Sequence, residues 1–162
     1  LVVSGVTYNL DEAKIRVKGV VDQPGIAGRI FSPLSEAQIV VDVIIQNQSS
    51  DGSTDMTFTV PRSDHARALE ITRATAGRIG AESVEGEAEI AKVSIVGLGM
   101  RDHAGVATKM FNVLAEKGIN IQLINTSEIK VSVVIEEGEA QRAVEALHEA
   151  FVADGAAAPK EE

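Results

Sequence analysis

The sequence predicts an α+β fold in which one β-α-β-β-α-β unit occurs twice. Residues 12–50 align with residues 90–128 after a single two-residue insertion. Apolar residues recur with a period of two where strands are expected and of about 3.6 where helices are expected. A glycine, Gly25 in one copy and Gly105 in the other, stands at the same junction between the first strand and the first helix. These three observations indicate a duplicated supersecondary unit.

Each copy begins with a strand and a helix. Side chains that alternate along the chain predict the strands, at residues 15–20 and 93–97. The helices follow the glycines, because apolar residues then fall at helical spacing. Those apolar residues are Ile26, Ala27, Ile30, Phe31 and Leu34 in the first copy and Val106, Ala107, Met110, Phe111 and Leu114 in the second.

Two further strands and a second helix continue each copy. The second helix of the second copy has a clean apolar stripe that ends at Phe151, whereas that of the first copy is weaker and ends at Gly77 and Gly80. The strands are predicted at 40–47 and 55–60 in the first copy and at 120–127 and 130–136 in the second.

A ferredoxin-like unit needs one more strand after its second helix. The first copy has a candidate at 83–89, but the second copy has none after Phe151. The unassigned strand at residues 2–8 is therefore expected to complete the second copy. The predicted domains are a first domain at 12–89, a second, discontinuous domain at 1–11 plus 90–152, and a disordered tail at 153–162.

Composition excludes several classes of function. The net charge of −9 argues against nucleic acid or an anionic membrane as partner, and aromatic residues make up only 3% of the chain. No cysteine is present, so disulfides and thiolate metal sites are excluded. No apolar run reaches the ~20 residues of a membrane span, and no signal peptide is visible. We expect a cytoplasmic protein, and the first residue, Leu1, suggests a piece of a longer chain.

The junction at Gly25 has the chemistry of an amino-acid site. A strand that turns directly into a helix leaves backbone N–H groups free at the helix N-terminus, which favours a carboxylate. Asp22 stands three residues before Gly25, where its carboxylate can take an ammonium group. Polar strand ends, Gln46 among them, would discriminate between side chains. The simpler alternative is that Asp22 only caps the helix and that Gly25 only forms a tight turn.

No catalytic, metal or cofactor site is predicted. The three histidines, His65, His103 and His148, are scattered and lack metal-ligand spacing. The segment "GLGMRDHAG" has an aspartate where a dinucleotide-binding fingerprint needs its third glycine. A small ferredoxin-like enzyme such as an acylphosphatase would need an Arg-Asn pair at a phosphate loop, and none is visible.

Residues 2–152 resemble the regulatory region of aspartate kinases, which consists of two tandem ACT domains. The motifs that carry the resemblance are "SGVTYNLDEAKIRVKGVVDQPG", "VVDVIIQNQSSDGSTDMTFTVPRSD", "KVSIVGLGMRDHAGV" and "NIQLINTSEIKVSVVI". The resemblance implies feedback inhibition by threonine, lysine or both, sheets set side by side, a homodimer, and a kinase catalytic domain or α subunit as partner. An ACT-type sensor of a different biosynthetic enzyme is the alternative, because a fold does not fix a function.

The resemblance also implies two effector sites. The second junction has His103 and Ala104 where the first has Gln23 and Pro24, so equal occupancy of the two sites is not expected. The first site would comprise Asp22, Gly25, Ile26, Ala27 and Gln46 with Asn120 and Ile121, and the second Val41 and Asp42 with Asn125, Thr126, Ser127 and Glu128.

Overall fold

The computed structural model describes residues 3–100, 103–152 and 158–162. The chain forms two compact units. The inserted unit spans Asp11–Ala88, and the split unit combines Leu1–Leu10 with Glu89–Glu162.

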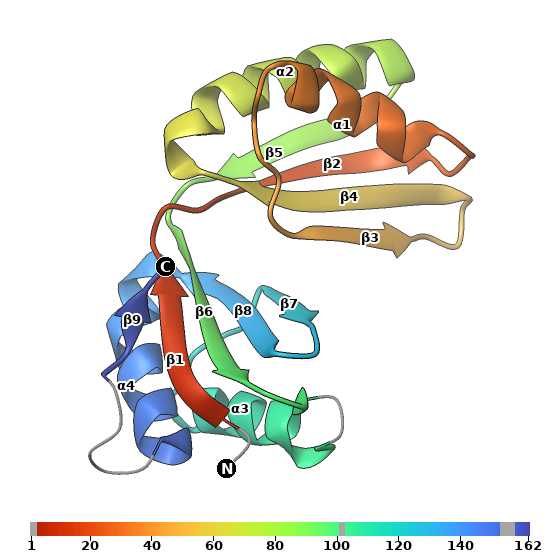
Figure 1. Cartoon of the computed structure of the whole chain (residues 1–162). Helices are drawn as coiled ribbons and strands as arrows, with labels where there is room; N and C mark the ends of the chain where they lie inside the picture. The colour runs from red at the N-terminus through yellow and green to blue at the C-terminus, as the bar shows by residue number, and fades with distance from the viewer. Residues whose placement is uncertain (1–2, 101–102, 153–157) are drawn as a thin grey trace. The chain divides into compact units, whose positions relative to one another are not determined.

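The inserted unit is a four-stranded antiparallel sheet with helices α1 and α2 on one face (Figure 1). Its strands lie in the order β3-β4-β2-β5, so the first strand of the unit is central. The elements in chain order are β2 (Ala13–Val21), α1 (Ile26–Glu36), β3 (Ile44–Gln48), β4 (Ser53–Val60), a 3-10 turn η1 (Arg62–Asp64), α2 (His65–Ile79) and β5 (Ser83–Glu87).

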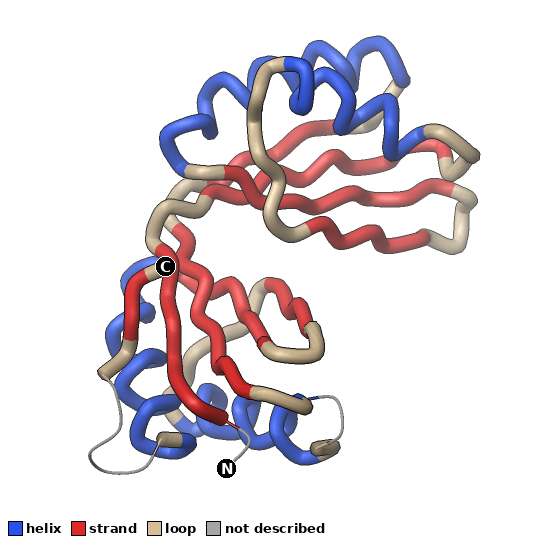
Figure 2. The backbone as a smooth tube through the Cα atoms, viewed as in Figure 1, coloured by secondary structure: helices blue, strands red, loops and turns tan. Residues whose placement is uncertain are grey.

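The split unit repeats this arrangement with a strand taken from the other end of the chain. Its sheet has the order β7-β8-β6-β1-β9, with α3 and α4 on one face (Figure 2). The elements are β1 (Val3–Asn9), β6 (Ile90–Gly97), α3 (Gly105–Glu116), β7 (Leu123–Thr126), β8 (Lys130–Glu136), a 3-10 turn η3 (Glu137–Glu139), α4 (Ala140–Phe151) and β9 (Lys160–Glu161).

Strand β1 occupies in the split unit the place that β5 occupies in the inserted unit. It pairs antiparallel with β6, from Val3 opposite Gly97 to Asn9 opposite Lys92. Strand β5 pairs in the same sense with β2. The predicted fold class, two ferredoxin-like units with the second completed by the N-terminal strand, is therefore confirmed.

Aliphatic side chains form a separate core in each unit, between the sheet and its helices. In the inserted unit Ile15, Ile30 and Leu34 are fully buried. The ring of Phe58, also fully buried, packs edge-on against Phe31 with 5.1 Å between ring centroids. In the split unit the corresponding residues include Ile95, Met110, Leu114, Val133 and Leu147. Among the described residues, no helix is long and apolar enough to cross a membrane.

Strand β3 begins later than the predicted range 40–47. The backbone N–H of Val43 donates to the hydroxyl Oγ1 of Thr59 (3.1 Å) rather than to a ladder carbonyl. The N–H of Asp42 donates to the backbone carbonyl of Thr59 (3.1 Å). Regular pairing with β4 therefore starts only at Ile44. Strand β7 is likewise shorter than its predicted range 120–127.

The end of the chain differs from the disordered tail predicted at 153–162. Residues 153–157 lie outside the described residues, but Lys160 and Glu161 form β9, parallel to β1. The carboxylate of Glu162 accepts a hydrogen bond from Thr7 (2.9 Å) and ion-pairs with Lys92 (3.1 Å) and Lys130 (3.0 Å). Burial alone would raise the pKa of Glu162, but hydrogen bonds from Lys130, Thr7 and Lys92 lower it. Charge pairing, which apolar periodicity does not reveal, thus orders this segment.

Truncating Phe58 should destabilise the inserted unit strongly. Because the side chain is fully buried against Phe31, Phe58→Ala leaves a cavity, and we expect the free energy of unfolding to fall by about 3–5 kcal/mol. Urea unfolding followed by circular dichroism measures the change. The exposed Val40→Ala is the control and should shift stability by less than about 0.5 kcal/mol. Equal effects of the two substitutions would contradict this core assignment.

Protonation of His65 should destabilise the fold. Burial, with a smaller effect of the positive charge on Arg73, lowers the pKa of His65, and its Nε2 has no hydrogen-bond partner in the described part of the chain. The unfolded state therefore binds more protons as the pH falls below about 6.5, and stability decreases there.

The measurement is the free energy of unfolding between pH 7.5 and 5.5 for the wild type and for His65→Asn. We expect the wild type to lose stability over this interval and the variant to lose less. The exposed His103→Asn serves as control. A pH slope that His65→Asn leaves unchanged would show that other groups cause it.

Candidate effector site

The junction between β2 and α1 is built around a left-handed glycine. Gly25 has φ 88° and is the N-cap of α1, with no side-chain hydrogen bond capping the helix. The N–H of Ile26 donates to the carbonyl of Gln23 (3.2 Å), and the Ile26 side chain is buried in the core. An L-residue at Gly25 would be strained by its backbone alone.

Asp22 does not cap the helix, which was the simpler alternative. Its Oδ2 instead accepts a hydrogen bond from Nε2 of Gln48 (2.8 Å), at the end of β3. Asp22 is exposed, as are Gly25 and Ala27 beside it. The junction therefore presents a solvent-facing carboxylate a few residues from the start of α1, whose first N–H groups have no partner within the helix.

Gln46 lies on the same face of the sheet as this junction. It stands opposite Met56 in the β3–β4 ladder, and Met56 packs in the core beneath the helices. Residues directly opposite in an antiparallel pair share a face, and side chains two apart along a strand do too. Gln46 and Gln48 therefore both project on the helix side of β3, where Gln48 contacts Asp22.

Gln48 is a residue that the sequence analysis missed. The signal was available, because Gln48 follows Gln46 at the two-residue spacing of one strand face. The range predicted for this strand, 40–47, ends one residue before Gln48. The structure extends β3 to Gln48.

Asn120 and Ile121 belong to the split unit, between α3 and β7. Asn120 is exposed, and Ile121 is partly buried against the core of that unit. Their contribution to the same effector site as Asp22 stays a prediction.

The predicted second site also draws on residues of both units. Ser127 forms a turn after β7, in which its N–H donates to the carbonyl of Lys130 (2.8 Å), and Asn125, Thr126, Ser127 and Glu128 are all exposed. Thr126 stands opposite core residue Val131, so it projects toward the helices, whereas Asn125 stands opposite Ser132 on the other face. Val41 and Asp42 precede β3 in the inserted unit.

The two junctions are not equivalent. Gly105 is the first residue of α3, and its N-cap, Ala104, has a right-handed backbone with φ −54°. The ring nitrogen Nδ1 of the exposed His103 lies 2.9 Å from the carbonyl oxygen of Gly99. Repeated sequence thus gives repeated elements but two different local geometries, and unequal occupancy of the two sites stays a prediction.

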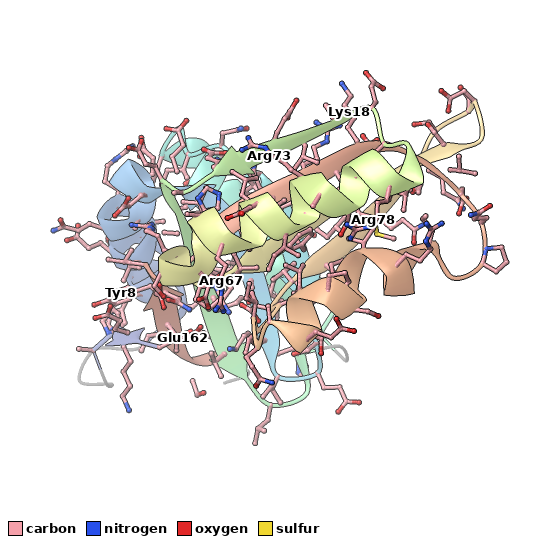
Figure 3. The ribbon with its side chains drawn as sticks, turned by 90° about the horizontal axis from the view of Figure 1, so that it is seen from above. Tyr8, Lys18, Arg67, Arg73, Arg78 and Glu162 are labelled. Carbon is pink, nitrogen blue, oxygen red and sulfur yellow. The ribbon has the colours of Figure 1, made fainter. Side chains whose placement is uncertain are left out.

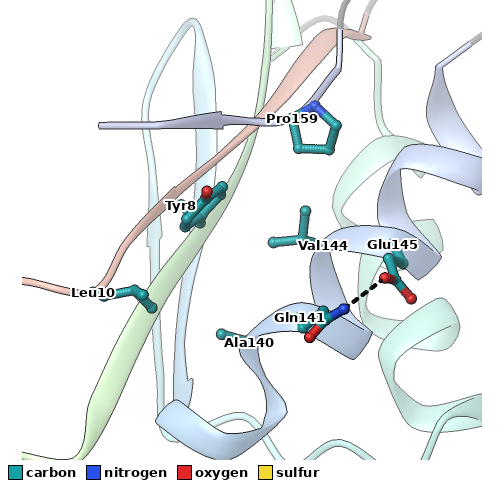
Figure 4. A pocket seen from close by; sticks show the side chains of 7 residues that line it. All are labelled: Tyr8, Leu10, Ala140, Gln141, Val144, Glu145 and Pro159. Atoms are coloured by element: carbon teal, nitrogen blue, oxygen red, sulfur yellow. Dashed lines mark hydrogen bonds between the residues drawn. The ribbon is translucent and has the colours of Figure 1, made fainter.

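A cavity of about 460 Å³ in the split unit is lined by residues outside both predicted sites. Its polar side chains, Gln141 and Glu145, hydrogen-bond to each other (3.1 Å), and Tyr8 closes one wall (Figure 4). The described residues include no group of three His, Asp or Glu side chains placed to hold a metal ion.

Comparison with known proteins identifies the family. A family model described as the ACT domain matches residues 15–74 and again residues 93–151. The chain belongs to the ACT domain family. One match falls in the inserted unit and the other in the split unit, so each unit carries one ACT domain.

These ACT domains occur together in aspartate kinases. The chain is 56% identical to an aspartokinase from Pseudomonas aeruginosa over 156 residues, which are 96% of this chain but 38% of that protein. It is 41% identical to the ligand-free regulatory subunit of aspartate kinase from Thermus thermophilus, with a TM-score of 0.88, covering 93% of this chain and 99% of that chain. A chain in a structure of aspartokinase α and β subunits is 51% identical, with a TM-score of 0.86 over 92% of this chain and 98% of that one. The tandem ACT domains of this protein therefore correspond to an aspartate kinase regulatory region.

Substituting the N-cap glycine of the first ACT domain should destabilise it. An alanine at Gly25 meets no atom within 4 Å, so only the left-handed backbone opposes it. We expect Gly25→Ala to lower the free energy of unfolding by about 1–2 kcal/mol. Urea unfolding measures the change.

Gly28→Ala is the matched control, because this glycine lies inside α1 with open space around its Cα and no left-handed φ. Alanine is the better helix former, so Gly28→Ala should raise stability by about 0.5–1 kcal/mol. Changes of the same sign at both positions would contradict the assigned backbone of the junction.

Proposed function

We propose that this chain is the allosteric, non-catalytic part of an aspartate kinase, and that it binds threonine, lysine or both for feedback inhibition. The observation that carries the proposal is the junction at Gly25. There an exposed carboxylate, Asp22, lies beside the uncapped N-terminus of α1 and is held by Gln48 from β3. A free amino acid carries an ammonium group, which complements the carboxylate of Asp22. It also carries a carboxylate, which complements the N–H groups at the start of α1.

The effector would bind with its ammonium group at Asp22 and its carboxylate at the N-terminus of α1. Gly25 would let the carboxylate approach the backbone, and Gln46 would contact the effector side chain. The buried side chain of Ile26 would support the junction from below. Asn120 and Ile121 complete the site in this proposal, and Val41 and Asp42 with residues 125–128 would form the second.

The regulated enzyme is inferred from the relatives. The chain spans about two fifths of the curated aspartokinases that it matches, so the kinase activity would reside in a catalytic domain or α subunit outside it. We propose a cytoplasmic homodimer that associates with that partner. An effector then inhibits the kinase only by its difference in affinity between the active and inhibited arrangements, typically about 1–3 kcal/mol.

A thermal-shift panel of free amino acids tests the proposal. Threonine or lysine at 100 times its dissociation constant should stabilise the fold by about 2.7 kcal/mol. A response to another amino acid alone would support the alternative, an ACT-type sensor of a different biosynthetic enzyme.

Asp22→Asn tests the first site, because it removes the charge and keeps the shape. We expect it to abolish the threonine response while the protein stays folded. Glu36→Gln is the control, since Glu36 is an exposed acid at the end of the same helix and should leave the response intact. Full threonine affinity in Asp22→Asn would remove Asp22 from the site.

A further inference from the structure

A pocket separate from the candidate effector site lies in the groove between α1 and α2. Its volume is about 360 Å³, and small-molecule sites typically have volumes of about 300–1,000 Å³. Arg29 and Ser32 line it from α1, and Thr75 and Arg78 line it from α2. It shares only Gly25 with the candidate effector site, and no aspartate or glutamate lines it.

The two arginines are available to a ligand. Arg78 donates to Oγ1 of Thr75 (3.2 Å), and Thr75 is only 2% exposed, so this contact orients the guanidinium. Figure 3 shows Arg78 on the side of α2 that faces α1. Neither Arg29 nor Arg78 forms an ion pair with a carboxylate in the described part of the chain. Two unneutralised positive charges in one pocket are unexpected on a chain of net charge −9.

The donors that line the pocket are of the kind that binds a doubly charged oxyanion. Each guanidinium presents N–H groups in a planar fork that pairs with carboxylate or phosphate oxygens. Two such groups, with the Ser32 hydroxyl, supply more charge and more donors than one carboxylate uses. Gly28 leaves the α1 side of the groove open, because it carries no side chain.

We propose that the groove between α1 and α2 binds a phosphate group, with Arg29 and Arg78 as its two charged ligands. Two sources share this chemistry: the free phosphate ion and a small phosphate monoester. Phosphate bound in this groove would act on the first ACT domain through α1, independently of the amino-acid effector.

The test is calorimetric titration of the 162-residue chain with inorganic phosphate and with glycerol 3-phosphate at constant ionic strength. We expect saturable binding, weakened about tenfold or more by Arg29→Gln and by Arg78→Gln. Tighter binding of glycerol 3-phosphate would identify a monoester as the ligand, and weaker binding would identify the phosphate ion.

Arg73→Gln is the matched control, because Arg73 lies on α2, is exposed and does not line the pocket. Its phosphate affinity should equal that of the wild type. An equal loss in all three variants would mean diffuse electrostatic attraction and would overturn the proposal. Absence of saturable binding, or acetate binding as tightly as phosphate, would also overturn it.

The threonine response separates this proposal from the amino-acid effector site. Arg78→Gln should keep that response and lose phosphate binding, whereas Asp22→Asn should do the reverse. Loss of both responses in Arg78→Gln would mean that the groove is part of the effector site and not a site of its own.

Discussion

A single apolar layer between one face of a sheet and two helices holds each unit together, and the functional features depend on it. Aliphatic side chains fill this layer almost alone, with Phe58 and Phe31 as the one ring pair of the inserted unit's described core. Helix α1 lies on that layer, and the short connection of residues 22–25 joins it to β2. In this connection Gly25 has a left-handed backbone and Asp22 is exposed.

Features set by periodicity could be predicted from the sequence. The repeat, the helix faces and the use of residues 2–8 to complete the second unit follow from apolar spacing and from counting strands. Features set by individual hydrogen bonds could not. The late start of β3 depends on the Thr59 hydroxyl, and the ordering of residues 160–162 depends on Glu162 contacting Thr7, Lys92 and Lys130. Such contacts join residues far apart in sequence and leave no periodic signal.

The candidate site was predictable in outline for the same reason. The glycine junction and Asp22 are local in sequence, whereas the partner of Asp22, Gln48, comes from a neighbouring strand whose exact end decides which side chain reaches it. The two features near α1 come from different elements. The Asp22–Gln48 contact joins the turn before α1 to the end of β3, whereas Arg29 of α1 and Arg78 of α2 line the groove between the two helices.

The pairing of β1 with β6 makes the two units unequal during synthesis. All strands of the inserted unit are contiguous in the chain, so its sheet can close as soon as β5 leaves the ribosome. Strand β1 emerges first but has no partner until β6 follows, about 80 residues later. Over that interval the backbone N–H and C=O groups of β1 are unpaired and can pair with other strands. Closing this sheet also costs more conformational entropy, because the loop between β1 and β6 is the longer one. A permuted gene that encodes β1 after α4 would turn the nested pair into two consecutive modules.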